Sequence, residues 1–345
     1  MSGSGAPGSD AIADVRAFFR GRALCAAVRL GIADNLDVDR SLEDLAERVH
    51  ANGPALRRLL RGLASIGVVE LRAGDEVALT EYGQTLRHDH PDSIWTTVVF
   101  WADLLADNWA YLDECVRTGE TAWSVAERSG TTLRFANEPN ANEVFHGAMS
   151  AGNGEEAHRP IVDAYDFATT RIVADLGGGG GGLLAAVLTA HPAARGVLVE
   201  VAGALNEATV RLDAAGVIDR CELIECDLYD GVPVDADVYV LKHVLHACND
   251  DEARTIVKNV RERMSAGSKL LVIEVTLPDT VTAPDIDVEQ AAIVDLTMLV
   301  MTGGRERTTS EWAELLNEAA LTVTTATSVS RPGREPLTVI EAVPS

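Results

Sequence analysis

The chain has 345 residues, of which 47% are hydrophobic, so it can bury a large core, and its length suggests two domains. The formal net charge of -24 argues against binding to nucleic acids or anionic membranes, which repel a strongly acidic protein. The five cysteines form no C-x-x-C pair, which argues against a disulfide framework or a zinc site. The sequence contains neither a membrane-length apolar run nor a signal-peptide pattern, so we expect a cytoplasmic protein.

The first hundred residues predict a winged-helix domain, which we place at residues 10–92. Apolar side chains recur at helical spacing over residues 10–33. Two short amphipathic helices are expected at residues 41–50 and 54–65, with Ser41 as an N-cap and Pro54 in a first turn. Two strands joined by a tight turn are expected at residues 67–79.

A winged helix is compatible with DNA binding, and the second short helix does carry Arg57, Arg58 and Arg61. Residues 1–100 nevertheless hold 14 acidic side chains against 11 arginines and no lysine. Because no basic surface surrounds the three arginines, the composition favours dimerisation and shielding of a substrate over DNA binding. We therefore predict a homodimer formed through this domain.

The segment 93–165 predicts a helical linker or lid over a substrate. It carries most of the tryptophans, with a phenylalanine and a methionine near its end. Such side chains usually serve packing, although one or two could line a pocket. They are Trp95, Trp101, Trp109, Trp123, Phe145 and Met149.

From residue 166 to 345 the pattern predicts a Rossmann-like α/β domain with a doubly wound sheet. Strands are expected at 172–175, 196–200, 221–226, 236–241 and 269–274, with helices at 183–190, 203–215 and 251–264 between them. Two further strands, at 321–327 and 336–342, are too close in sequence for a crossover helix and must pair antiparallel. Ligands of such a sheet bind at the carboxyl ends of its strands.

Six consecutive glycines, Gly177–Gly182, follow the first strand of this domain and precede a helix. Glycine permits the close approach of a bulky ligand and positive backbone φ angles. The run also satisfies the dinucleotide pattern G-x-G-x-x-G, so alone it does not identify the ligand. It is not a phosphate-binding loop, because no Gly-Lys-Ser/Thr ends it.

Three acids stand at or directly after the ends of successive strands: Asp175, Glu200 and Asp227. Glu200 is suited to the two hydroxyls of a ribose, and Asp227 to the exocyclic amine of an adenine, with Leu228 beside the ring. Three carboxylates would repel a pyrophosphate. The set therefore favours a cationic cofactor with an adenosine moiety.

These features resemble the cofactor motifs of class I S-adenosylmethionine-dependent methyltransferases. The runs 241–250, 270–274 and 303–308 narrow the resemblance to small-molecule O-methyltransferases of plant phenylpropanoid and bacterial antibiotic pathways. These enzymes carry an N-terminal winged-helix dimerisation domain, and the resemblance extends from about residue 12 to the final hairpin. It implies that S-adenosylmethionine is the cofactor and S-adenosylhomocysteine the product, with Asp175, Gly177, Gly179, Gly181, Glu200, Asp227, Leu228 and Lys242 at the cofactor.

The same resemblance implies that His246 is a general base and that Glu274 and Glu306 flank and orient it. The family pattern after this histidine is Asp-Trp, where the chain has Ala247 and Cys248. His243 is the only histidine near His246 in sequence, and a pair spaced by three argues against a metal site.

We therefore predict an O-methyltransferase that acts on a hydroxyl of an aromatic or apolar small molecule. A phenol with a pKa of about 10 is a poor nucleophile at neutral pH, and a histidine with a pKa of about 6.5 can accept its proton. Candidate pocket residues are Trp101, Phe145, Met149, His243, Met298 and Met301. Two alternatives are kept: methyl transfer to carbon or nitrogen, and a non-catalytic winged-helix regulator that senses a small ligand.

Overall fold

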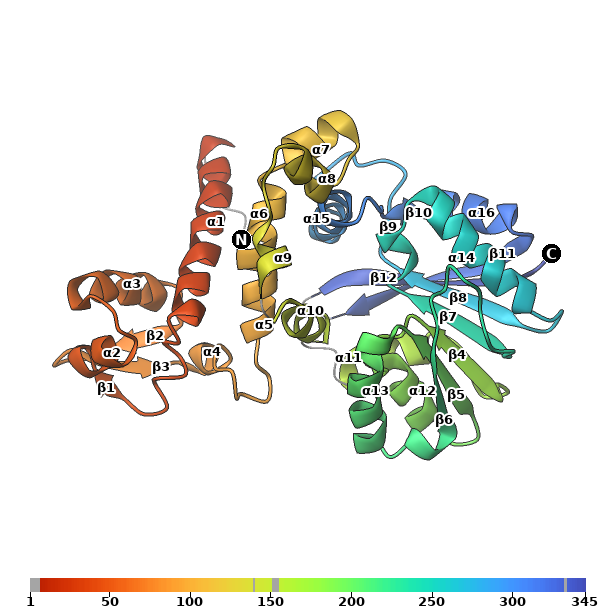
Figure 1. The fold of residues 1–345 in the computed structure, drawn as a ribbon, viewed down its shortest axis with the longest axis horizontal. Helices are drawn as coiled ribbons and strands as arrows, with labels where there is room; N and C mark the ends of the chain where they lie inside the picture. The colour runs from red at the N-terminus through yellow and green to blue at the C-terminus, as the bar shows by residue number, and fades with distance from the viewer. Residues whose placement is uncertain (1–6, 139, 151–154, 332–333) are drawn as a thin grey trace. The chain divides into compact units, whose positions relative to one another are not determined.

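The computed structural model describes residues 7–138, 140–150, 155–331 and 334–345 (Figure 1). These residues belong to two compact units, which are described separately below. The first comprises Met1–Asp107 and Leu133–Gly152, and the second comprises Asn108–Thr132 and Asn153–Ser345. Residues 1–6 lie outside the described residues.

The first unit begins with the predicted helices and hairpin of a winged helix. Its three-stranded antiparallel sheet has the order β1-β3-β2. The elements are α1 (Pro7–Arg29), β1 (Arg40–Ser41), α2 (Leu42–Arg48), α3 (Gly53–Ser65), β2 (Val69–Leu71), β3 (Glu76–Leu79) and α4 (Glu81–Gln84). The two-residue strand β1 was not predicted, because so short a strand carries no periodic pattern.

Side-chain caps explain where α2 and α3 begin. The Ser41 hydroxyl accepts a hydrogen bond from the Asp44 amide at 3.1 Å, and the Asn52 side chain accepts one from the Ala55 amide at 3.0 Å. Pro54 lies in the first turn of α3, where its missing N–H has no intrahelical partner to lose. The predicted roles of Ser41 and Pro54 are thus confirmed.

The segment 93–165 is helical, as predicted, but consists of short helices distributed over both units. In the first unit these are α5 (Trp95–Thr97), the π-helix η1 (Val98–Leu104), α9 (Arg134–Asn137) and α10 (Ala141–Ser150), and α6 (Leu105–Trp109) crosses the division between the units. In the second unit they are α7 (Leu112–Thr118), α8 (Ala122–Arg128) and α11 (Glu155–Asp163). Asp103 of η1 is buried and binds Arg22, Arg29 and Arg134, which ties η1 to α1 and α9.

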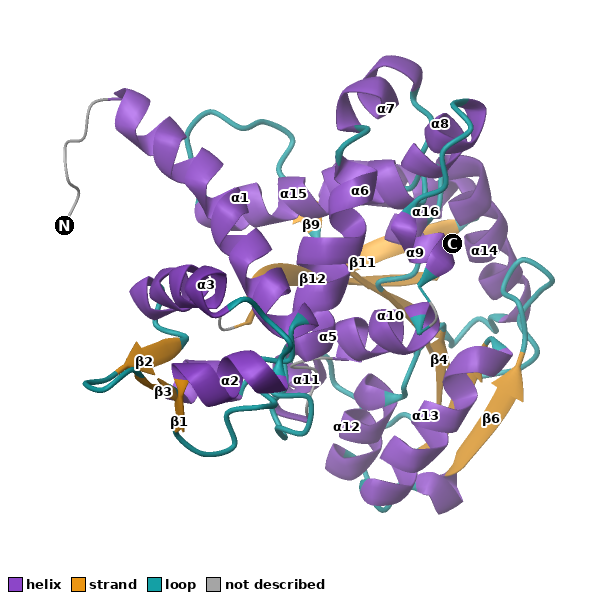
Figure 2. Cartoon of the chain, turned by 60° about the vertical axis from the view of Figure 1, so that its left-hand side comes forward, coloured by secondary structure: helices purple, strands orange, loops and turns teal. Residues whose placement is uncertain are grey.

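The second unit contains a seven-stranded mixed sheet in the order β11-β12-β8-β7-β4-β5-β6 (Figure 1). Figure 2 shows β4 and β6 of this sheet with α12 and α13 beside them. Five strands are parallel, and β12 pairs antiparallel with both β8 and β11, which confirms the predicted doubly wound sheet and its terminal hairpin. The strands are β4 (Ile172–Leu176), β5 (Arg195–Glu200), β6 (Cys221–Glu225), β7 (Val238–Lys242), β8 (Lys269–Glu274), β11 (Leu321–Arg331) and β12 (Arg334–Pro344).

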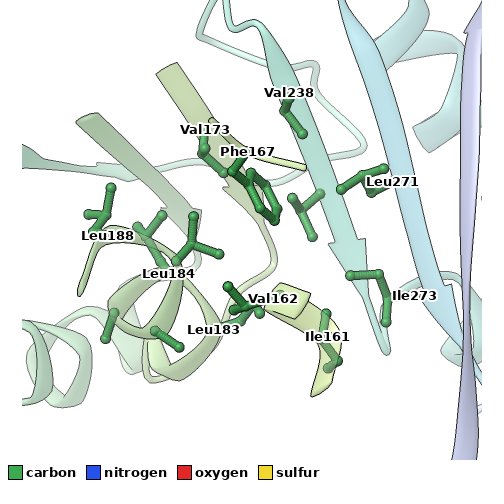
Figure 3. Packing of buried hydrophobic residues seen from close by; sticks show 14 of the residues in the cluster. Ile161, Val162, Phe167, Val173, Leu183, Leu184, Leu188, Val238, Leu271 and Ile273 are labelled. Atoms are coloured by element: carbon green, nitrogen blue, oxygen red, sulfur yellow. The ribbon is translucent and has the colours of Figure 1, made fainter. Parts of the chain in front are cut away.

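Helices cover both faces of this sheet. On one face lie α11, α12 (Gly182–Ala190) and α13 (Ala202–Ala214), and on the other lie α14 (Asp250–Arg263) and α16 (Thr309–Glu318). The alternation of side chains along β7 shows the two layers. Val238 and Val240 join the first core, part of which is shown in Figure 3, whereas Tyr239 and Leu241 join the second.

Several elements of the second unit were not predicted. They are α15 (Ile286–Met301), α16, and the parallel pair β9 (Thr276–Leu277) and β10 (Arg307–Thr308). Strand β7 starts at Val238 rather than at Ala236, because the Ala236 amide donates to the Tyr239 hydroxyl at 2.9 Å instead of joining the sheet. All five cysteines are free, and among the described residues no helix is long and apolar enough to cross a lipid bilayer.

Candidate active site

The glycine turn lies between β4 and α12 and requires glycine at alternate positions. Gly177, Gly179 and Gly181 have φ angles of 68°, 54° and 71°, which side-chain-bearing residues rarely adopt. A Cβ at Gly177 would lie 2.8 Å from a methyl group of Val244, so this position also needs glycine for space. A Cβ at Gly179 would meet no atom within 4 Å, so the protein leaves this side of the turn open.

Beside the turn is a cleft of about 180 Å³, bordered by the ends of β4, β5 and β6. Residues that line it include Gly177, Glu200, Asp227, Leu228, Tyr229 and Val244. A larger hollow of about 740 Å³ lies between α2 and α3 in the first unit. We assign the site to the smaller cleft, because only this one is lined by the glycine turn and by the acids at the strand ends.

Backbone amides orient Glu200, one of the acids of the cleft. Its two carboxylate oxygens accept hydrogen bonds from the amides of Gly179 and Val201, at 2.9 and 2.8 Å. The carboxylate therefore stands at the open side of the glycine turn.

The segment carrying Asp227 is also fixed. Asp227 accepts a hydrogen bond from the Tyr229 amide at 2.9 Å. The Asn259 side chain of α14 donates to the carbonyl oxygens of Leu228 and Tyr229, at 2.8 and 3.1 Å. Sequence reasoning missed Tyr229 and Asn259, and an aromatic residue two positions after a strand-end acid was the only available signal for the former.

Asp175 lies beneath the turn and is only 1% exposed. In the described part of the chain neither of its carboxylate oxygens has a hydrogen-bond partner of good geometry. Burial raises the pKa of Asp175 to about 7, and Glu200 adds to this, while Lys242 and the nearby Leu184 amide oppose it. A buried acid without compensation is expensive for a protein to keep, which points to a ligand-related role.

His246 lies in the short 3₁₀ turn Leu245–Ala247 that follows β7. Its Nδ1 atom is 2.7 Å from Oε1 of Glu306 and 3.8 Å from Oε2 of Glu274. Burial alone would lower the pKa of His246, but the charges of Glu274 and Glu306 outweigh it and place the pKa above 6.5.

Glu274, at the end of β8, is completely buried and holds the backbone of the same turn. Its Oε1 atom accepts hydrogen bonds from the amides of Val244 and Leu245, both at 3.0 Å. Burial raises the pKa of Glu274 to about 7, and Glu306 adds to this while His246 opposes it. The three residues predicted for acid–base chemistry thus lie together, two residues from Val244 in the wall of the cleft.

His243 faces the same carboxylate. Its Nδ1 atom is 3.6 Å from Oε2 of Glu274, and its ring centre is 5.2 Å from that of His246. Its φ of 53° is unusual for a residue other than glycine. One potential ligand atom from each of His243, His246 and Glu274 lies within 4.8 Å of the other two. Within this cluster, Nδ1 of His246 is paired with Glu306.

The other predicted pocket residues fall into two groups. In the first unit, Trp101 is 40% exposed, Met149 is exposed, and Phe145 packs edge-on against Phe100 at 5.5 Å between ring centres. In the second unit, Met298 of α15 is buried and Met301 is partly exposed. The contacts within each unit do not gather these residues into one pocket, so their role stays a prediction.

Ala247 and Cys248, which replace the family's Asp-Trp, change the side chains near the cleft. Cys248 is buried, and its Sγ atom lies 3.5 Å from the hydroxyl of Tyr229. Ala247 supplies no polar group. Tyr229 is therefore the aromatic side chain lining the described cleft.

A mixed α/β sheet with a glycine turn, strand-end acids and an adjacent acid–base cluster defines a methyltransferase-type domain. Residues 109–322 match the O-methyltransferase domain family, and residues 15–87 match the O-methyltransferase dimerisation domain. The chain belongs to the O-methyltransferase family, which confirms the predicted fold class and enzyme class.

Individual relatives span nearly the whole chain. The phenazine O-methyltransferase PhzM of Lysobacter antibioticus is 34% identical over 327 residues, which cover 94% of this chain and 92% of that protein. The solved structure of the mitomycin 7-O-methyltransferase MmcR has a TM-score of 0.85 and 34% identity, covering 99% of this chain and 98% of its own. An 8-amino-8-demethylriboflavin N,N-dimethyltransferase of Streptomyces davaonensis is 32% identical over 310 residues, or 87% of this chain and 86% of that protein. Other solved relatives, 29–30% identical, hold S-adenosylmethionine or S-adenosylhomocysteine.

Proposed function

We propose that the chain transfers a methyl group from S-adenosylmethionine to a hydroxyl of an aromatic or apolar small molecule, in secondary metabolism, with His246 as the general base. The observation that carries this proposal is the juxtaposition of the cleft and the acid–base cluster. Val244 lines the cleft and touches the glycine turn, and its amide binds Glu274 beside His246.

The residues around the glycine turn fit the cofactor. The open side of Gly179 leaves room for close approach, and Glu200 and Asp227 offer acceptors for a ribose and for an exocyclic amine. Asp175, Gly177, Gly181, Leu228 and Lys242 would complete this site. The orphaned carboxylate of Asp175 and the absence of a phosphate-binding loop favour a cationic ligand over a pyrophosphate. When bound, S-adenosylmethionine supplies an electrophilic methyl group on a sulfonium.

The protein's own contribution is to position the acceptor and remove its proton. Because Nδ1 of His246 faces Glu306, an Nδ1–H donated to that carboxylate leaves Nε2 as the proton acceptor. Glu306 and Glu274 then stabilise the imidazolium that forms. A base of this kind typically contributes ~10²–10⁴-fold, and positioning contributes further.

The functional unit we propose is a homodimer. Residues 15–87 match a dimerisation domain, and α1 exposes Ile12, Val15, Phe18 and Phe19, each at least 54% accessible. Contiguous exposed apolar side chains on a helix usually mark an interaction surface.

Methyl transfer to nitrogen is the second candidate, supported by the riboflavin-type N,N-dimethyltransferase among the relatives. The presence of His246 with two carboxylates favours oxygen, because a phenol needs a base and a neutral amine does not. A panel of phenols, hydroxynaphthoates, hydroxyphenazines and the matching aryl amines, assayed with methyl-labelled cofactor, distinguishes the two. Transfer only to the amines would exclude the O-methylation proposal, and mass spectrometry of ligands retained on purification would guide the panel.

Calorimetry tests the cofactor site directly. We expect saturable binding of S-adenosylmethionine and S-adenosylhomocysteine, and weak or absent binding of NAD. Gly179→Val should abolish binding, because the new side chain occupies the open side of the turn. Gly216→Val is the matched control, since Gly216 also has a positive φ, 68°, and open surroundings but lies after α13 away from the cleft. Equal affinity for NAD, or full binding by Gly179→Val, would count against this assignment. If the protein binds S-adenosylmethionine but methylates no acceptor of the panel, the result would favour the non-catalytic regulator.

A further inference from the structure

Arg307 is a buried cation that the chemistry described so far does not use. It lies in β10, directly after Glu306, and is only 1% exposed. A buried guanidinium must have its donors satisfied, since desolvation of an unpaired charge is costly. The hydrogen-bond partners of Arg307 therefore indicate its structural role.

The guanidinium donates to backbone carbonyls on both sides of the His246 turn. One terminal nitrogen lies 3.1 Å from the carbonyl oxygen of Leu245, and the other lies 3.4 Å from that of Cys248. Leu245 and Cys248 are the residues that flank His246 and Ala247 in the chain. The guanidinium thus bridges the two ends of the segment that carries the base.

The other contacts of Arg307 keep the guanidinium in place. The same nitrogen that reaches Cys248 lies 2.7 Å from Oδ1 of Asp250, at the start of α14, and the guanidinium carbon lies 4.9 Å from the ring centre of Trp312. Burial would raise the pKa of Asp250, but Arg307 and Arg305 lower it, so the pair is ionic. A planar fork can make these contacts together, whereas a lysine ammonium cannot span them.

We propose that Arg307 is a positioning residue for the general base: it fixes the His246 turn against the segment that carries Glu306. This inference rests on the proposed role of His246. Glu306 and Arg307 are adjacent, so one short segment at the start of β10 supplies both the carboxylate that faces the imidazole and the guanidinium that holds the backbone of the His246 turn. The two segments touch closely, because a Cβ at Gly304 would overlap the carbonyl oxygen of His246.

The test compares Arg307→Lys with Arg305→Lys. Arg305 contacts the same Asp250 but is half-exposed and makes none of the contacts to the His246 turn, so its variant controls for charge and for Asp250. We expect Arg307→Lys to lower kcat about 10-fold on the best acceptor of the panel, because small displacements of catalytic groups are costly, while S-adenosylhomocysteine binding stays within about twofold of wild type. Arg305→Lys should resemble wild type in both.

A second readout does not depend on the acceptor. The imidazole resonance of His246, assigned by its loss in His246→Ala, reports the pKa of the base by NMR titration. The groups facing His246 are Glu274, Glu306, Lys242 and His243, and Arg307→Lys replaces none of them. Loosening the contact with Glu306 should lower the pKa of His246, whereas a general loss of stability would leave it in place.

The outcomes separate this inference from the proposed function. If His246→Ala keeps the wild-type kcat, the general-base role fails and the inference fails with it. If His246→Ala is slow but Arg307→Lys matches Arg305→Lys in kcat and in the His246 titration, only the inference is overturned. Should Arg307→Lys fail to bind S-adenosylhomocysteine, Asp250→Asn provides the same comparison. Asp250 is the partly exposed partner of the buried Arg307, so this change weakens the ion pair that holds the guanidinium. An unchanged kcat and titration in Asp250→Asn would then overturn the inference.

Discussion

The Nδ1 atom of His246 lies 2.7 Å from Oε1 of Glu306, although 60 residues separate the two in the chain. The fold brings them together: His246 follows β7 of the large sheet, and Glu306 precedes β10, which pairs with β9 just after β8. Glu274 at the end of β8 lies beside the imidazole, with Oε2 at 3.8 Å from Nδ1 of His246, and binds the backbone of the His246 turn. Three separate segments therefore meet at one imidazole.

Removal of the base tests this cluster most directly. His246→Ala should lower kcat by ~10²-fold or more while leaving the affinity for S-adenosylhomocysteine nearly unchanged, because the ring does not line the cofactor cleft. Glu274→Gln should cost less, since the base remains and the amide oxygen can still accept from Val244 and Leu245. Steady-state kinetics and calorimetry on the three proteins provide the comparison. Wild-type turnover by His246→Ala would force withdrawal of the O-methylation proposal, though not of the cofactor assignment.

The pH dependence of kcat should follow from the carboxylates around His246. The base is active when neutral, and its pKa is raised above 6.5, so activity should fall as the pH drops through a value above 6.5. Glu274 titrates nearby, with a pKa of about 7. The acidic limb of the pH–kcat profile therefore belongs to the cluster rather than to one residue. Glu306→Gln removes a negative charge beside the ring and should move this limb to lower pH. A limb that stays in place in Glu306→Gln would show that the acid does not tune the base.

Much of the second unit could be predicted because its signals are local. Buried parallel strands read as short apolar runs, and the glycine turn with Asp175 and Glu200 marks the ends of two of them. The remaining strand-end acid, Asp227, was found in the same way and lines the cleft. The places of these three acids in the fold followed from strand order alone, whereas their roles at the cofactor stay predictions.

What sequence could not supply depends on contacts between distant segments. Nothing near Arg307 in sequence indicates that its guanidinium reaches the carbonyls of Leu245 and Cys248, because that contact exists only when β10 lies beside the His246 turn. The helical character of residues 98–104 was predicted, but the burial of Asp103 there was not, because it depends on three arginines from other helices. The division into domains at residues 92 and 165 also stays a prediction.

Stability should depend on pH through Asp175. Its pKa is raised to about 7 in the folded protein, above the value of an unfolded aspartate, so its contribution to stability is fully present below pH 4 and is lost as the pH rises through about 7. Asp175→Asn removes the cost of ionising this buried group. At pH 8 it should therefore raise the melting temperature by about a few degrees more than it does at pH 5. Thermal unfolding of both proteins at the two pH values gives the comparison, and a shift of the same size at both would contradict the raised pKa. Binding of S-adenosylmethionine should weaken in the same variant.

The last prediction concerns assembly. Light scattering of the wild-type protein should give about twice the chain mass of 36.7 kDa. Phe18 and Phe19 are 60% and 61% exposed on α1, so charges there would face the proposed partner without entering the core of the chain. The double change Phe18→Glu and Phe19→Glu should yield monomers at micromolar concentration, because two desolvated carboxylates in an apolar interface are strongly unfavourable. Val210→Glu is the matched control, since Val210 is 72% exposed on α13 outside the dimerisation domain, and it should leave the dimer intact. A wild-type monomer would refute the homodimer, and a dimer that persists in the double variant would place the interface elsewhere than on this part of α1.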